Sequence, residues 1–198
     1  MGKLFPRFYD IAMTPLENTR FKKIRESLVS IASGRVLEIG SGTGVNFPYY
    51  KSGVQVDAIE PNPLMMNQTE KRIKAAQVPI KTHLAKAENL PFADDSFDTV
   101  VATLVFCTIP DPVKALQEIK RVSKPGAKFL LFEHVRLDKE LMGKTQDLLT
   151  PAWKKICDGC HLNRDTVSLL RNAGIPITKV NSFYGGLFLT IECGIEKE

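Results

Sequence analysis

The chain has 198 residues, of which 43% are hydrophobic and 25% are charged, a composition typical of one globular domain. Its net charge of +5 is spread along the chain, and basic clusters such as the one around Arg25 are expected on solvated helix faces. No apolar run reaches the roughly 18–20 residues that cross a membrane, and residues 1–10 do not resemble a signal peptide. We therefore expect a single cytoplasmic domain whose four cysteines are reduced.

Helix and strand signals alternate along the chain with short connections. Capping residues followed by proline open several helices, and short β-type apolar runs mark the strands. In chain order the prediction is helix 15–33, strand 36–39, strand 54–59, helix 63–76, strand 80–84, strand 99–106, helix 112–122, strand 127–135, helices 139–149 and 163–173, and strands 178–183 and 187–195.

This alternation predicts a doubly wound, Rossmann-like α/β sheet that is mostly parallel. The turn at residues 184–186 predicts a C-terminal hairpin that adds an antiparallel strand. Ligands bind such sheets beyond the carboxyl ends of the strands. Chemistry is therefore expected just after Ile39, Ile59, Leu84, Leu104 and His134.

A glycine-rich turn, with Gly40, Gly42 and Gly44, follows the first predicted strand. Glycine allows a sharp turn and a close approach of the backbone to a ligand. A dinucleotide fingerprint would need a third glycine at position 45, which is Val45. Glu38 would repel a pyrophosphate and favour a cationic or zwitterionic ligand. S-adenosylmethionine, with a sulfonium, an ammonium and no phosphate, fits this pattern better than NAD does.

Two further carboxylates follow the next predicted strands. Glu60 lies 20 residues after Gly40, the spacing at which an acidic residue accepts hydrogen bonds from ribose hydroxyls. Glu88 is placed to accept the amino group of an adenine, with Leu90 and Phe92 as walls for the ring. The alternatives are an exposed glutamate at a strand end and a solvated glutamate in a loop.

These segments, with Lys124-Pro125-Gly126, resemble class I S-adenosylmethionine-dependent methyltransferases over about residues 35–135. A narrower resemblance is to the methyltransferase-like thiol S-methyltransferases. It is carried by residues 42–47, 60–63, 105–109, 132–135 and 158–164. Animal members of that family carry an N-terminal membrane-anchoring stretch that residues 3–5 do not match. We therefore expect no membrane span and leave peripheral membrane contact open.

The superfamily resemblance implies which residues bind the cofactor. Glu38 would hold its amino end directly or through water, Gly40, Gly42 and Gly44 would pass its methionine part, and Glu60 would bind the ribose. The other implied contacts are Pro61 and Asn62 beside the adenosine, Ala87 and Glu88 at the adenine, Thr103 and Leu104 under the cofactor, and Tyr9 in a lid. One domain would then comprise a helical lid (1–34), a cofactor-binding core (35–135), and substrate-side helices with the terminal hairpin (136–198).

The segment Cys157-Asp158-Gly159-Cys160-His161 matches the C-x-x-C-H string of haem attachment. Nothing indicates export or a second axial ligand, so a haem is not expected. A zinc site needs about four ligands, and Cys107 or Cys193 would have to complete this local set. We expect no metal site. Reduced cysteines packed near the substrate are the leading interpretation, with a redox pair as the alternative.

A base is not obligatory for the expected reaction. In-line methyl transfer from a sulfonium depends mainly on alignment and exclusion of water, and a thiolate is already nucleophilic. His134, at the ligand-binding edge, is the candidate base, with a structural role as the alternative. An apolar acceptor cavity could be lined by Phe106, Ile109, Leu141, Leu149, Trp153, Phe183 and Phe188.

The expected function is S-adenosylmethionine-dependent methylation of a small molecule, with a thiol as the first acceptor class. The alternatives are a phospholipid or quinone methyltransferase, suggested by residues 88–92 and by a basic surface with Trp153-Lys154-Lys155, and a non-catalytic cofactor-binding module. Nucleic acid is not expected as a partner, because the chain has neither an Asn-Pro-Pro-Tyr/Phe signature nor a long basic stripe.

Overall fold

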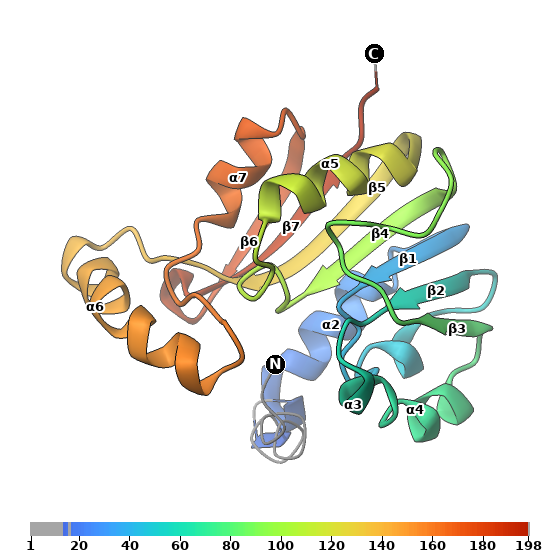
Figure 1. The fold of residues 1–198 in the computed structure, drawn as a ribbon, viewed down its shortest axis with the longest axis horizontal. Coiled ribbons are helices and arrows are strands. Elements are labelled where there is room, and N and C mark those ends of the chain that lie inside the picture. Colours follow the sequence, from blue (N-terminus) through green and yellow to red (C-terminus); the bar gives the residue numbers. More distant parts are fainter. Residues whose placement is uncertain (1–13, 16, 198) are drawn as a thin grey trace.

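In the computed structural model, which describes residues 14, 15 and 17–197, a seven-stranded sheet has the order β3-β2-β1-β4-β5-β7-β6 (Figure 1). The strands are β1 (Arg35–Ile39), β2 (Gln55–Ile59), β3 (Ile80–His83), β4 (Phe97–Thr103), β5 (Ser123–His134), β6 (Ile177–Phe183) and β7 (Phe188–Gly194). The helices are η1 (Glu17–Phe21), α2 (Lys22–Val29), η2 (Phe47–Tyr49), α3 (Pro63–Met66), α4 (Glu70–Ala75), α5 (Pro112–Val122), α6 (Glu140–Ile156), α7 (Thr166–Asn172) and η3 (Tyr184–Gly186). The candidate lid residue Tyr9 lies outside the described residues.

The sheet confirms the predicted fold class. β1 pairs in parallel with β2 and β4, β2 pairs in parallel with β3, and β4 pairs in parallel with β5. The terminal hairpin inserts β7 antiparallel between β5 and β6. The chain reverses its strand order between β1 and β4, and this switch point is where doubly wound sheets bind ligands.

The core has one apolar layer on each face of the sheet. Leu37 and Ile39 of β1 pack in the layer with α5 and α7, and Val36, the residue before Leu37, packs in the layer with α2 and η2. Side chains of a strand alternate between its faces, so both faces of β1 are covered. This explains why the strands read as nearly continuous apolar runs.

Local capping signals were predicted well, but several helix bounds were wrong, including the end of the first helix, which lies at Val29 and not at residue 33. Asn62 Oδ1 accepts the amide of Leu64, and Asp111 Oδ1 accepts that of Lys114, both at 3.0 Å, as caps should. The helix predicted over 63–76 is instead two short helices, α3 and α4, separated by residues 67–69. α6 continues through Pro151 to Ile156.

α6 projects from the rest of the molecule with its polar face inward (Figure 1). Its buried residues are Gly143, Gln146 and Thr150. Six large apolar residues are exposed on this helix: Leu141, Met142, Leu148, Leu149, Trp153 and Ile156. Within the described part of the chain, no helix is both long and apolar enough to cross a membrane.

Candidate active site

A cavity of about 340 Å³ opens at the carboxyl ends of β1, β2 and β4, within the size range of small-molecule sites. Nine of the residues predicted from the sequence to bind a cofactor line it. They are Gly40, Gly42, Glu60, Pro61, Asn62, Ala87, Glu88, Thr103 and Leu104. The structure therefore brings together at one site most of the candidates, which come from four separate segments.

The turn after β1 brings its backbone against the cavity. Gly40 and Gly42 have positive φ angles of 61° and 56°, which favour glycine. A Cβ atom on Gly40 would lie 2.2 Å from Cγ2 of Val105, so no side chain fits there. The hydroxyl oxygen of Ser41, between the two glycines, is buried and finds no hydrogen-bond partner among the described residues. A glycine cradle with an unpartnered buried hydroxyl fits a polar ligand group.

Gly44 belongs to the structure of the turn and does not line the cavity. It also has a positive φ, of 81°, and a Cβ atom on it would lie 2.6 Å from the ring of Phe47. Of the three glycines predicted to pass the cofactor, Gly40 and Gly42 therefore line the cavity and Gly44 does not.

Glu60 joins the glycine turn to the next segment. Its two carboxylate oxygens accept the amides of Gly42 and Asn62, each at 2.9 Å. Burial raises the pKa of Glu60, and these two hydrogen bonds oppose the rise. Each carboxylate oxygen can accept a further hydrogen bond, as ribose binding would require.

Glu38 lies behind the cavity and does not line it. The hydroxyl of Tyr50 donates to one carboxylate oxygen at 2.7 Å, and the amide of Asn46 donates to the other at 3.1 Å. Burial raises the pKa of Glu38 to about 7. Because Asn46 does line the cavity, Glu38 is positioned to act through Asn46 on whatever binds there.

Arg25 is a site residue that the sequence analysis placed wrongly on a solvated helix face. Its side chain is buried and lines the cavity. Nη1 donates to Asn46 Oδ1 at 3.0 Å and to Thr103 Oγ1 at 2.7 Å, while Glu17 pairs with Nη2 at 2.9 Å. Thr103 is 78 positions away in the chain, so no local pattern could reveal this contact.

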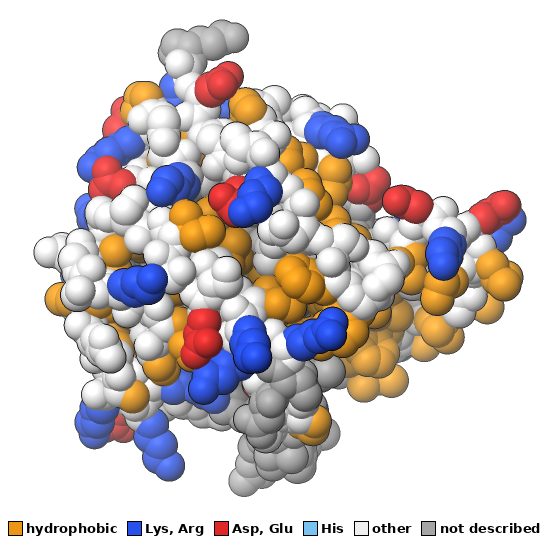
Figure 2. All heavy atoms as spheres, turned by 180° about the vertical axis from the view of Figure 1, so that it is seen from behind, with side chains coloured by type: hydrophobic (Ala, Val, Ile, Leu, Met, Phe, Trp, Pro, Cys, Tyr) orange, Lys and Arg blue, Asp and Glu red, His pale blue; other side chains and the backbone are white. Residues whose placement is uncertain are grey.

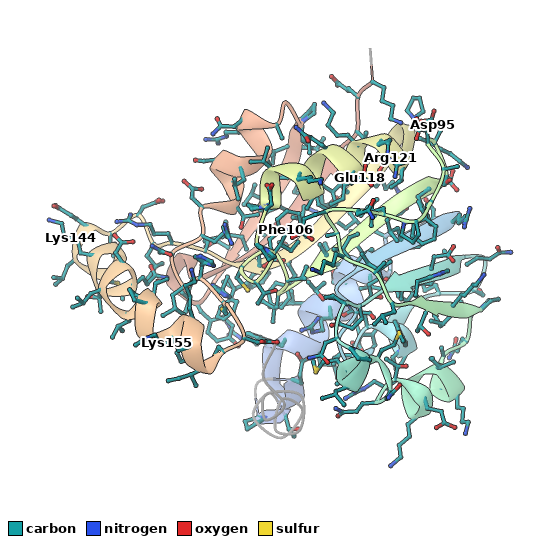
Figure 3. The ribbon with its side chains drawn as sticks, viewed as in Figure 1. Asp95, Phe106, Glu118, Arg121, Lys144 and Lys155 are labelled. Atoms are coloured by element: carbon teal, nitrogen blue, oxygen red, sulfur yellow. The ribbon has the colours of Figure 1, made fainter. Side chains whose placement is uncertain are left out.

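The predicted adenine walls are not in the cavity. Leu90 is buried in the core, and Phe92 packs edge-to-face on His83 and Phe97. Among the residues proposed for an acceptor cavity, only Ile109 lines this site. Phe106 is fully buried beyond the end of β4, near the start of α5 (Figure 3).

The prediction extended the fourth strand to Phe106, but β4 ends at Thr103. Leu104 adopts a φ of 54°, and its amide donates to the carbonyl of Phe132 at 2.7 Å. The amides of Val105 and Phe106 both donate to Oε1 of Glu133, at 2.9 and 3.0 Å. Burial raises the pKa of Glu133 to about 7. This buried carboxylate holds the corner that leads to Thr108, Ile109 and Pro110 in the lining of the cavity.

Beside this corner, His134 meets two cysteines. Nε2 of His134 lies 3.3 Å from Sγ of Cys160, and Cys107 completes the cluster. The hydrogen bond from Cys107, followed by the hydrogen bond and charge of His134, lowers the pKa of Cys160 to about 4. Burial lowers the pKa of His134, but the hydrogen bond and the charge interaction with Cys160 raise it, and the net shift is upward. The candidate base is therefore engaged with the side chain of Cys160.

The sheet order, with the antiparallel strand β7 beside β5 and a glycine-rich turn at the switch point, is that of a class I S-adenosylmethionine-dependent methyltransferase. Residues 37–131 match the family described as "Methyltransferase domain". A solved S-adenosylmethionine-dependent methyltransferase from Thermotoga maritima shares the fold, with a TM-score of 0.70 at 23% identity over 98% of each chain. The cofactor of this class is S-adenosylmethionine, and the cradle with its unpartnered Ser41 hydroxyl fits that cofactor.

Similarity to two curated proteins indicates which methyltransferases the chain is related to. The thiol S-methyltransferase TMT1B of Rattus norvegicus is 39% identical over 176 residues, which cover 84% of this chain and 69% of the relative. A phosphatidylethanolamine N-methyltransferase of Cereibacter sphaeroides is 33% identical over 113 residues, which cover 56% of each protein. The chain belongs to the family of the thiol S-methyltransferases.

Proposed function

We propose that this methyltransferase acts on the sulfur of a small thiol. The observation that carries the proposal is the similarity to a thiol S-methyltransferase, which extends over 84% of the chain. The shorter similarity to the phosphatidylethanolamine enzyme covers 56% of the chain. The acceptor side of the cavity supports a small acceptor, because it is lined by Thr108, Ile109 and Pro110 in a site of about 340 Å³.

The residues that line the cavity have distinct proposed roles. Glu60 holds the ribose, Glu88 the adenine, and the Gly40–Gly42 cradle with Ser41 the methionine end. Asn46, held by Glu38 and Arg25, faces the same end. S-adenosylmethionine, when bound, supplies a methyl group on a sulfonium sulfur. The chain contributes alignment of the acceptor sulfur and exclusion of water.

The reaction requires the acceptor as a thiolate, and its proton passes to solvent. No strong base is needed, because an ordinary thiol with a pKa of about 8.5 is already partly ionised near neutral pH. The rate should therefore rise with pH until the free thiol is ionised. A protein base such as His134 would instead add its own titration to the profile.

The experiment is a screen of the purified protein with labelled S-adenosylmethionine against alkyl thiols, hydrogen sulfide, phenols, amines, phosphatidylethanolamine and a quinol. Mass spectrometry identifies the methylated atom, and Glu60→Ala is the inactive control. We expect an S-methyl product from a thiol. Methylation of a phenol, an amine, phosphatidylethanolamine or the quinol, with no turnover of any thiol, would refute the proposal that the acceptor is a thiol.

A phospholipid or quinone acceptor is the second candidate, and the exposed face of α6 favours it. Figure 2 shows hydrophobic side chains gathered on this projecting helix. Lys144 and Lys155 lie towards opposite ends of the helix (Figure 3). Apolar side chains with flanking lysines suit peripheral contact with an anionic membrane.

The membrane proposal is tested by co-sedimentation with phosphatidylserine vesicles. Leu148, which is 80% exposed, is the residue to change, and we expect Leu148→Ser to weaken binding without lowering thermal stability. Equal vesicle binding by the wild type and by Leu148→Ser would refute the proposed membrane contact.

The domain division and the location also belong to this proposal. Residues 1–34 would form the lid with Tyr9, 35–135 the cofactor-binding core, and 136–198 the acceptor side, in a cytoplasmic protein. Limited proteolysis with and without S-adenosylhomocysteine tests the lid, because ligand should protect cleavage sites within residues 1–34.

A further inference from the structure

Three metal-ligating side chains meet beside the cavity from three separate segments. Cys107 comes from the corner after β4, His134 from the end of β5, and Cys160 from the segment after α6. Sγ of Cys107, Sγ of Cys160 and a ring nitrogen of His134 all lie within 4.8 Å of one another. Both cysteines are buried, and His134 is half-buried.

The backbone around the cluster is held in place. The amide of His161 donates to the carbonyl of Cys107 at 2.9 Å, which ties the two cysteine segments together. Glu133 fixes the corner before Cys107 through two backbone amides. Such outer contacts orient the ligands of metal sites.

We propose that Cys107, His134 and Cys160 bind a zinc ion whose fourth coordination position receives the sulfur of the methyl acceptor. The acceptor part rests on the proposed thiol methylation. Three protein ligands with one open position are the pattern of catalytic zinc sites, and thiolate and imidazole ligands suit zinc.

The spacing of the ligand atoms agrees with tetrahedral zinc. With Zn–S bonds of about 2.3 Å and a Zn–N bond of about 2.0 Å, neighbouring ligand atoms lie roughly 3.5–3.8 Å apart. The observed distance from His134 Nε2 to Cys160 Sγ is 3.3 Å, and the whole set spans no more than 4.8 Å. Small side-chain adjustments would suffice to bring the ligands to the ion.

The position of the cluster suits delivery of an acceptor. Thr108 follows Cys107 directly, Asp158 precedes Cys160 by two positions, and both line the cavity. A zinc-bound thiolate would form a sulfur–carbon bond as the sulfonium–carbon bond breaks, after its proton has left to solvent. The neutral thioether product is a weaker ligand than the thiolate and would leave, and zinc undergoes no redox change.

The zinc ligands considered from the sequence were Cys157, Cys160 and His161, with Cys107 or Cys193 to complete the set. In the structure Nδ1 of His161 lies 3.1 Å from the carbonyl oxygen of Cys107 and 3.2 Å from Nη2 of Arg164. His134 takes its place in the cluster, from a strand 26 positions earlier in the chain than Cys160.

The test uses the full chain, purified with a phosphine reductant in place of a thiol, and loaded with zinc or cobalt(II). We expect about one metal ion per chain, with sulfur-to-cobalt charge-transfer absorption. Cys160→Ser and His134→Gln should each weaken metal binding by more than about 100-fold, because even outer-shell substitutions commonly cost 10–100-fold. The matched control is Cys157→Ser, which removes a nearby thiol outside the cluster and should bind metal as the wild type does.

Addition of an alkyl thiol should shift the visible cobalt spectrum if the open position takes the acceptor. Failure of the reduced wild type to bind metal, or equal metal binding by all variants, would overturn the site. Thiol methylation by metal-free protein would also refute the inference while leaving the proposed function intact. Metal binding without methylation of any thiol would instead refute the proposed function and the acceptor part of this inference.

Discussion

Removal of the Glu60 carboxylate should weaken cofactor binding through one identifiable contact. Each of its oxygens already accepts a backbone amide, from Gly42 and Asn62, and each can accept one ribose hydroxyl as well. A hydrogen bond to a charged group contributes about 1.5–3 kcal/mol, so Glu60→Ala should raise the Kd for S-adenosylhomocysteine about 10- to 150-fold. Loss of the brace on Gly42 adds to this effect.

The ribose contact can be separated from the brace by a double-mutant cycle on protein and ligand. Isothermal titration calorimetry would compare S-adenosylhomocysteine with an analogue lacking both ribose hydroxyls, in the wild type and in Glu60→Ala. If Glu60 binds the ribose, the analogue has a much higher Kd than S-adenosylhomocysteine in the wild type, and the difference between the two ligands is much smaller in the variant. The exposed Glu70 gives the matched control Glu70→Ala, which should bind like the wild type. An equal rise in Kd for the analogue in the wild type, Glu60→Ala and Glu70→Ala would refute the assignment of Glu60 to the ribose.

Three further outcomes are expected. Gly40→Ala should abolish cofactor binding and destabilise the fold more than Gly53→Ala in chemical denaturation. Both glycines have positive φ, so an alanine at either position costs about 1–2 kcal/mol of backbone strain. Only at Gly40 would the new Cβ atom also clash with a side chain, that of Val105. Equal losses in the free energy of unfolding for the two variants would refute this reasoning. The raised pKa of Glu38 gives a stability contribution that is present below pH 4.5 and lost as pH rises through about 7, amounting to about 3 kcal/mol. Denaturation curves should lose this pH dependence in Glu38→Gln, and an unchanged pH profile would contradict the assignment. Arg25→Lys should raise the Kd for S-adenosylhomocysteine about tenfold by calorimetry, because lysine cannot reproduce the planar fork; wild-type affinity would exclude a role at the cavity.

Features that depend on short-range chemistry could be predicted from the amino-acid sequence. Asn62 and Asp111 were predicted as helix caps because a capping side chain bonds an amide two or three positions ahead. The alternation of helix and strand predicted the mostly parallel sheet, because crossover rules leave few topologies, and the turn at residues 184–186 predicted the antiparallel hairpin. Since the carboxyl ends of parallel strands meet at one edge, Gly40, Glu60 and Glu88 were also expected in one site, and they line one cavity.

Contacts between side chains that are far apart in the chain could not be predicted from the sequence. Arg25 reaches Thr103 over 78 positions, and Cys107 meets His134 and Cys160 because β4, β5 and the segment after α6 end at the same edge. These contacts depend on packing angles and burial, which leave no periodic trace in the sequence. Glu38 likewise lies behind the cavity lining, because Asn46 and Tyr50 donate hydrogen bonds to its buried carboxylate there.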